Sequence, residues 1–197
     1  MRRGLIAIAG LTLVGATATQ GAEPGASPVP AAVRALSGCW AGEGSVMGKP
    51  VTISLTGTPA ALGAMFVIET ESRAKADRKD RYAAHLVFGG GERKADAGAE
   101  AVTGYWADSF GGTFTATGTG SAGPGGFEIS YRYPDDIFVN RWSIAATRAT
   151  WSILARHGDA APKTFASYVL FRRPCRAGRQ AVASPRKADQ VELKPSA

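Results

Sequence analysis

Apolar and polar residues alternate along much of this chain between residues 39 and 173. The alternation is strictest in four stretches, 51–56, 113–117, 127–133 and 150–153. Side chains of a strand point to opposite faces in turn, so this period of two predicts strands with one buried face. In the second stretch, Phe114 and Ala116 are expected on the buried side. The chain is therefore predicted to be mostly β-structure.

Six weaker stretches add further strands to this pattern. They are separated by sequences rich in Gly, Pro, Asn and Asp, including Gly118–Gly126, which is expected to be a turn. About ten short strands in succession favour an antiparallel barrel or sandwich. One short helix is expected at Ala31–Leu36, after Pro30. The additional strands are expected at residues 39–44, 64–71, 81–88, 101–107, 137–144 and 164–172.

The first residues have the order of a secretory leader. Met1-Arg2-Arg3 is basic, residues 4–16 are apolar, and small residues such as Ala18 and Ala22 follow. This order predicts a signal peptide at 1–22, removed on export. The apolar run is shorter than the ~20 residues of a membrane-spanning helix. The mature chain is expected in the periplasm or the medium, without a transmembrane segment.

Charge divides the remaining chain. The 23 Lys and Arg residues exceed the 16 Asp and Glu residues, but the two groups balance between Glu23 and Phe171. The excess lies in the leader and after Phe171, so the basic composition gives no support to nucleic-acid binding by the folded part. The predicted organisation is a linker and short helix at 23–35, a barrel domain at 36–175 and a disordered basic tail at 176–197.

Cys39 and Cys175 are the only two cysteines. In an exported protein two lone cysteines usually pair, which predicts a disulfide that joins the first strand to the last. The alternative is a lipobox, Leu36-Ser37-Gly38-Cys39, with a lipidated Cys39. Against it, a proline-containing segment separates this motif from the apolar leader, and lipidation leaves Cys175 unpaired.

The first predicted strand, Gly38-Cys39-Trp40-Ala41-Gly42-Glu43-Gly44, contains a G-x-W-x-G-x-G motif. It resembles the first strand of lipocalin-like (calycin) barrels, which include fatty-acid-binding and nitrobindin-like proteins. The stretches Tyr105–Gly112 and Asn140-Arg141-Trp142 are also similar to uncharacterised bacterial lipocalin-like domains. The resemblance implies an all-β, antiparallel lipocalin-like barrel. In it, Trp40 plugs the closed end, and Arg172 or Arg173 on the last strand lies over the indole.

The resemblance does not imply a cofactor here. Nitrobindin-like proteins hold haem iron through a histidine on a late strand, and the matching stretch, residues 165–171, contains none. The chain has two histidines, His85 and His157, and neither has the spacing of a zinc ligand set. No metal and no cofactor are expected.

Catalytic residues are not evident either. Asp108-Ser109 with His85 lacks the G-x-S-x-G turn that supports a hydrolase triad. Glu69 and Glu71 share one face of a predicted strand, which is most simply an exposed face. We therefore predict no catalytic residues and lean away from an enzyme.

The interior is the remaining candidate site. A barrel of this size is either filled by side chains or holds one small ligand. Because a shift of one residue inverts a strand, Arg141 rather than Trp142 is inward in the opposite register. The expected function is binding of a small apolar or amphipathic ligand by a monomer. The alternatives are an envelope interaction protein, using the barrel surface or the basic tail, and an enzyme that uses the lumen. The predicted lumen residues are Trp106, Phe114, Tyr131, Tyr133, Phe138, Asn140, Trp142 and Trp151.

Overall fold

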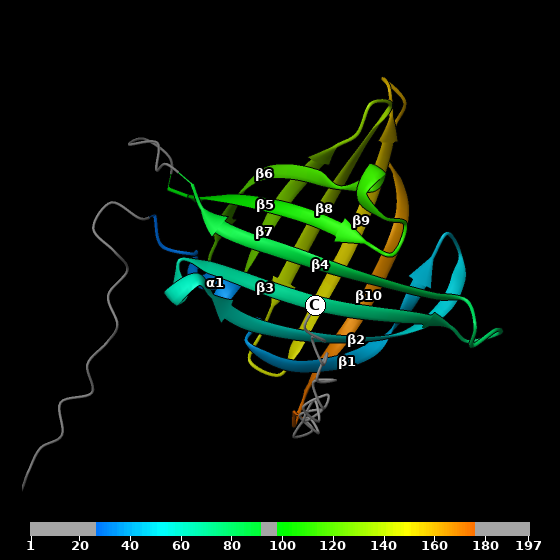
Figure 1. Ribbon diagram of the computed structural model, residues 1–197, viewed down its shortest axis with the longest axis horizontal. Helices are drawn as coiled ribbons and strands as arrows, with labels where there is room; N and C mark the ends of the chain where they lie inside the picture. Colours follow the sequence, from blue (N-terminus) through cyan, green and yellow to red (C-terminus); the bar gives the residue numbers. More distant parts are fainter. Residues whose placement is uncertain (1–26, 92–97, 176–197) are drawn as a thin grey trace, which may run out of the picture.

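Ten antiparallel strands form one closed barrel in this computed structural model (Figure 1), which describes residues 27–91 and 98–175. Each strand pairs with its neighbours in the chain, and β1 also pairs with β10. The elements are α1 (Ala31–Arg34), β1 (Gly38–Val46), β2 (Lys49–Ala60), η1 (Ala61–Gly63), β3 (Met65–Ala74), β4 (Arg81–Gly90), β5 (Glu100–Asp108), η2 (Gly112–Phe114), β6 (Ala116–Gly123), β7 (Gly126–Arg132), β8 (Asp136–Ile144), β9 (Arg148–His157) and β10 (Lys163–Arg173).

Alternating burial explains the strands. In β2, Val51, Ile53 and Leu55 are buried while Thr52 and Ser54 are exposed. The same alternation continues in β3 and β4, so that one apolar face of each strand points toward the barrel core. The predicted all-β barrel of about ten strands with a short N-terminal helix is confirmed.

Closure depends on the pairing of the first strand with the last. Cys39 lies opposite Arg173, Trp40 opposite Arg172, and the register continues to Val46 and Ala166. Because both edges of the sheet are paired, neither exposes a row of unpaired backbone groups. Within the described ranges, no helix has the length and apolar character needed to cross a membrane.

One predicted turn was wrong. The stretch Gly118–Gly126 was expected to be a turn, but β6 extends through it as far as Gly123. Its glycines serve close packing: a Cβ on Gly120 would lie 1.9 Å from the Glu128 carbonyl oxygen, and one on Gly118 would lie 2.8 Å from the Tyr131 ring. Glycine here therefore permits strands and rings to approach, rather than marking a turn.

The two ends of the barrel differ in what covers them. Alternate turns of an up-and-down barrel lie at opposite ends, and α1 packs at the end that holds the β6–β7 and β8–β9 turns (Figure 1). We call this the clamped end. Val29, Val33 and Leu36, around α1, are fully buried there. The opposite end carries η2 and the half-buried rings Tyr82, Tyr133, Phe138 and Phe165, and we call it the aromatic end.

The predicted signal peptide at 1–22 and the predicted tail at 176–197 lie outside the described residues. The strands occupy Gly38 to Arg173, and Ala31–Arg34 forms the short helix, slightly shorter than the sequence pattern indicated.

Candidate functional site

Trp40 and Arg172 organise the clamped end. The Trp40 ring is 1% exposed, its Nε1 donates to the Leu36 carbonyl at 2.9 Å, and the Arg172 guanidinium lies 4.3 Å from the ring centroid. Arg172 also donates to the carbonyls of Ala35, Ser37 and Ala146 at 2.6–3.0 Å. One side chain thus joins the segment after α1 to the β8–β9 turn through charge-assisted hydrogen bonds, and it contacts the first strand through the Trp40 ring.

The predicted Cys39–Cys175 disulfide is present and lies at this same end. It joins residues 136 positions apart, with Cα atoms 5.2 Å from each other. Cys39 lies at the start of β1 and Cys175 follows β10. The disulfide therefore joins covalently the two strands whose backbone hydrogen bonds close the barrel.

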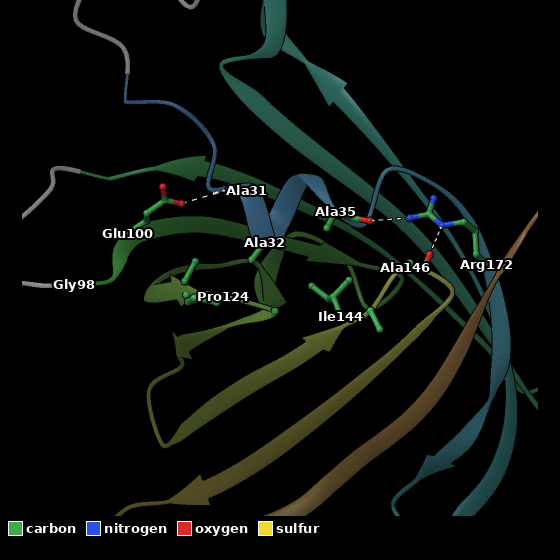
Figure 2. Close-up of a pocket in the computed structure, with 13 residues that line it drawn as sticks. Ala31, Ala32, Ala35, Gly98, Glu100, Pro124, Ile144, Ala146 and Arg172 are labelled. Carbon is green, nitrogen blue, oxygen red and sulfur yellow. Dashed lines mark hydrogen bonds between the residues drawn. The ribbon is translucent and has the colours of Figure 1, made fainter.

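A hollow of about 630 Å³ lies beside α1 (Figure 2). Small side chains such as Ala32 and Pro124 form much of its wall, with Ile144 beneath them. Arg172 borders it, but its guanidinium already donates to three carbonyls, and the Glu100 carboxylate accepts from the Ala31 N–H at 3.3 Å. The hollow lies between α1 and the β6–β7 and β8–β9 turns, outside the barrel interior.

Aromatic rings cluster at the centre of the barrel. Trp142 stacks on Trp151, with centroids 4.4 Å apart and planes 13° from parallel. Trp151 also contacts Tyr168 and Trp106, at 5.0 and 6.0 Å. The Trp151 Nε1 donates to the Asn140 Oδ1 at 2.8 Å, so one hydrogen bond fixes the stack against β8. The interior is therefore a rigid aromatic wall with a few polar atoms.

Three of those polar atoms are buried and have no hydrogen-bond partner among the described residues. They are the Tyr131 hydroxyl, Asn140 Nδ2 and Trp142 Nε1. The three side chains are 1%, 1% and 4% exposed. A buried polar group without a partner costs about 1–3 kcal/mol, and native proteins contain few of them.

The Tyr131 side chain packs closely against the neighbouring strands because they carry glycines there. A Cβ on Gly104 would approach its hydroxyl to 2.8 Å, and a Cβ on Gly118 would approach its ring equally closely. Burial raises the pKa of Tyr131, and burial also raises the pKa of Tyr168, to about 12. Both hydroxyls thus stay protonated at neutral pH and can donate a hydrogen bond.

A hydrogen-bonded triad sits at the aromatic end. The Tyr82 hydroxyl donates to Asp108 Oδ2 at 2.9 Å, and the Trp106 Nε1 donates to the same oxygen at 3.0 Å. The Phe110 N–H donates to Asp108 Oδ1 at 2.9 Å. Burial, and then the Asp108 charge, raise the pKa of Tyr82 and of Tyr133. Asp108 forms no ion pair with any basic side chain in residues 27–91 or 98–175.

Exposed rings surround this triad. Phe110 is 70% exposed and packs 5.7 Å from Tyr82, and Phe114 is 51% exposed and packs 6.0 Å from Phe110. The Tyr133 hydroxyl donates to the Phe114 carbonyl at 3.1 Å and so links the β5–β6 loop to the turn that follows β7. Phe138 continues the cluster from Tyr133, at 5.5 Å. The aromatic end is a contiguous ring surface around one carboxylate.

The predicted lumen residues therefore divide into three groups. Asn140 and the three tryptophans line the buried centre together with Tyr131, and Tyr133 and Phe138 are half-buried at the aromatic end. Phe114 does not lie in the strand that was expected for it. It closes the short helix η2 and is half exposed, because β6 begins only at Ala116.

Other sequence expectations are settled by burial. Trp142 faces inward and Arg141 outward, where its Nε donates to Glu128 at 2.5 Å. His85 also faces outward, 3.7 Å from Glu69 and well exposed, so it does not approach Asp108 as a triad member. Glu71 pairs with Arg73 and Arg81 on the outer surface, and the hydrogen bond from Arg73 lowers the pKa of Glu71.

Sequence reasoning did not find Tyr82 or Phe110, and it considered Asp108 only as part of a triad. Tyr82 alternates with Ala84 and Leu86, a period that marks the inward face of β4, and this was the available signal. The meeting of Tyr82 with Asp108 depends on the β4–β5 register, which places Ala84 opposite Asp108.

Comparisons with known proteins add the fold. No protein-family model and no curated protein matches this chain. Among solved structures, it is similar to Rv2717c from M. tuberculosis, with a TM-score of 0.55 and 15% sequence identity. The match covers 74% of this chain and 99% of that chain. At 15% identity this similarity shows a shared barrel fold only, so any inference about a ligand rests on the residues of the site.

Proposed function

We propose that this chain is an exported, lipocalin-like barrel protein that binds one small amphipathic molecule in its interior. The observation that carries the proposal is the set of three buried, unpartnered polar atoms, on Tyr131, Asn140 and Trp142. A ligand that accepts hydrogen bonds from them would remove the cost of leaving them unpaired. Such placed polar groups in an aromatic surround are typical of ligand sites.

The chemistry of these atoms limits the ligand. Asn140 Nδ2 and Trp142 Nε1 are donors only, and a protonated Tyr131 hydroxyl can donate as well. The matching group is an acceptor, such as a carbonyl, an ether or a carboxylate. The stacked rings of Trp142 and Trp151 favour a flat or apolar body beside it. The ligand is therefore apolar over most of its surface, with an acceptor at its inner end.

The partial exposure of the aromatic end favours that end as the entrance. Tyr82, Tyr133, Phe138 and Phe165 face inward there and are all partly exposed, whereas Phe66 and Phe88, at the other end, are 1% and 0% exposed. At the clamped end, Trp40 and Arg172 obstruct access.

Export and the lipocalin-like assignment belong to the same proposal. The leader pattern at 1–22 and the disulfide both favour an oxidising compartment. The G-x-W strand supports the assignment, because Trp40 lies at the closed end under a cation from the last strand. The barrel domain at 36–175 and the basic tail at 176–197 remain the proposed organisation.

Native mass spectrometry of protein purified from an exporting host tests the function. We expect loss of a leader-sized mass, one disulfide and one additional small molecule. The variant Tyr131→Phe removes only the unpartnered hydroxyl, so it should weaken ligand retention by roughly 2- to 10-fold. Without ligand, the same variant should be more stable than the native protein. Its free energy of unfolding, measured in urea, should be higher by about 1 kcal/mol.

Tyr82→Phe is the matched control. It removes a hydroxyl that donates to Asp108, so it should lower the stability of the free protein rather than raise it. A native mass without ligand after extraction from an exporting host, together with a destabilised Tyr131→Phe variant, would contradict the proposed function.

A further inference from the structure

We propose that the aromatic end recognises an organic cation, so that the ligand of the proposed function carries a substituted ammonium group at its outer end. The inference rests on that proposed function and adds the charge of the ligand. Its starting point is the half-buried Asp108 carboxylate, which has ring neighbours but no cationic partner in the described part of the chain.

Asp108 retains capacity for a partner. A carboxylate has about four acceptor positions. Tyr82, Trp106 and the Phe110 N–H occupy three of them. These donors orient the carboxylate but do not neutralise it, because all three are uncharged. A partly desolvated negative charge is stabilised by an opposite charge that comes close to it.

The surrounding rings determine which cation fits. Tyr82, Phe110, Phe114 and Tyr133 form one cluster around the carboxylate through ring contacts and the Tyr133–Phe114 hydrogen bond. Ring faces are negative and attract cations, especially weakly hydrated ones with alkyl substituents. A small inorganic cation would lose its water shell without oxygen ligands to replace it, and no group of three metal-ligating side chains occurs in the described ranges. A tertiary ammonium can donate its N–H to the open acceptor position and pack its alkyl groups on the rings. A quaternary ammonium supplies the charge and the ring contacts without that hydrogen bond.

The exposure of two of these rings is an independent observation. Phe110 and Phe114 are 70% and 51% exposed, although both lie in one contiguous cluster with half-buried rings. Deeper in the barrel, the unpartnered Tyr131 hydroxyl belongs to a ring that packs 5.4 Å from Trp106, which itself donates to Asp108. Trp106 therefore contacts both the cationic site and the acceptor-binding site, and the cationic site is the outer of the two.

Two probes of nearly equal shape separate charge from size. Benzyltrimethylammonium carries the cation, and neopentylbenzene is its uncharged isostere. Calorimetric titration of the full mature protein should show the cation bound about 10-fold more tightly than the isostere. Binding should shift the NMR signal of the Trp106 indole N–H, because that group donates to Asp108.

Asp108→Asn should abolish this preference, while Glu128→Gln, which removes an equal charge from the outer face, should leave it unchanged. If Asp108→Asn fails to fold, Phe114→Leu provides the second test, since it removes a half-exposed ring face and should weaken cation binding several-fold. Both probes binding equally to the native protein and to Asp108→Asn would overturn the cation inference and leave the proposed function standing. Failure of the function itself is measured separately, by a native mass without ligand.

Discussion

The two ends of this barrel use aromatic residues in opposite ways. At the clamped end, Trp40 is buried under Arg172, and both the Trp40 Nε1 and the Arg172 guanidinium have hydrogen-bond partners. At the aromatic end, Phe110 and Phe114 face solvent around a carboxylate with no countercharge in the described ranges. The difference separates two tasks. Satisfied, buried groups hold the sheet closed, whereas exposed rings and unpaired groups contribute little stability and are available to a ligand.

The largest expected effect is on the seam at the clamped end. Cys39→Ser with Cys175→Ser removes a bond that closes a loop of 136 residues. In the chain-entropy model this lowers the free energy of unfolding by roughly 4–5 kcal/mol. Urea unfolding of the double variant and of the native protein measures the loss. A midpoint that is unchanged would show that the β1–β10 hydrogen bonds alone maintain closure.

Removal of the plug should cost slightly less. Trp40→Ala deletes a fully buried ring, its hydrogen bond to Leu36 and the contact with Arg172. We expect a loss of about 3–5 kcal/mol, as for other large-to-small core substitutions. Trp40→Phe is the control that keeps an aromatic ring, and it should recover part of the loss in the same urea experiment. Equal losses in both variants would contradict a packing role.

Alkaline pH should lower the stability of the fold through its buried tyrosines. Burial raises the pKa of Tyr168 to about 12, above its value near 10 in the unfolded chain. The unfolded state therefore loses this proton first, so stability is complete below pH 10 and declines as the pH rises towards 12. The decline is on the order of 2–3 kcal/mol. Tyr168→Phe should remove this share of the decline and leave the share of Tyr82, Tyr131 and Tyr133, whose pKa values are also raised. A dependence that stays as steep in that variant would assign the whole effect to the other groups.

The smallest effect is expected at the exposed rings. Phe110→Ser removes a side chain that is 70% exposed, so the free energy of unfolding should change by less than about 0.5 kcal/mol. Thermal unfolding monitored by circular dichroism measures this. A large destabilisation would mean that the ring supports the barrel, and it would remove the contrast between the two ends.

The fold and the clamped end could largely be predicted from the sequence. Alternation of period two marked the inward faces of β2 and β7, and two cysteines at the limits of the strand-rich region indicated how the barrel closes. Both signals are local or depend only on counting, so they need no knowledge of the register between strands.

The aromatic end was less accessible to prediction. Phe114 precedes alternating threonines and so imitates a strand residue, although β6 begins two residues later. The contact of Tyr82 with Asp108 joins residues 26 positions apart, and only the register of β4 on β5 brings them together. Likewise, the alternation around Trp142 and Arg141 fixed the two faces but did not determine which was inward.

Because β1 pairs with β10, the barrel could keep the same arrangement of strands in space if the chain began at a different strand. Since Cys39 and Arg173 are neighbours across the seam, a short linker there could join the two ends of the strand-bearing region. New termini could then open at Leu62, an 83% exposed residue in the β2–β3 connection. Such a circular permutant would keep every strand pair and begin the chain at β3, leaving the aromatic end untouched.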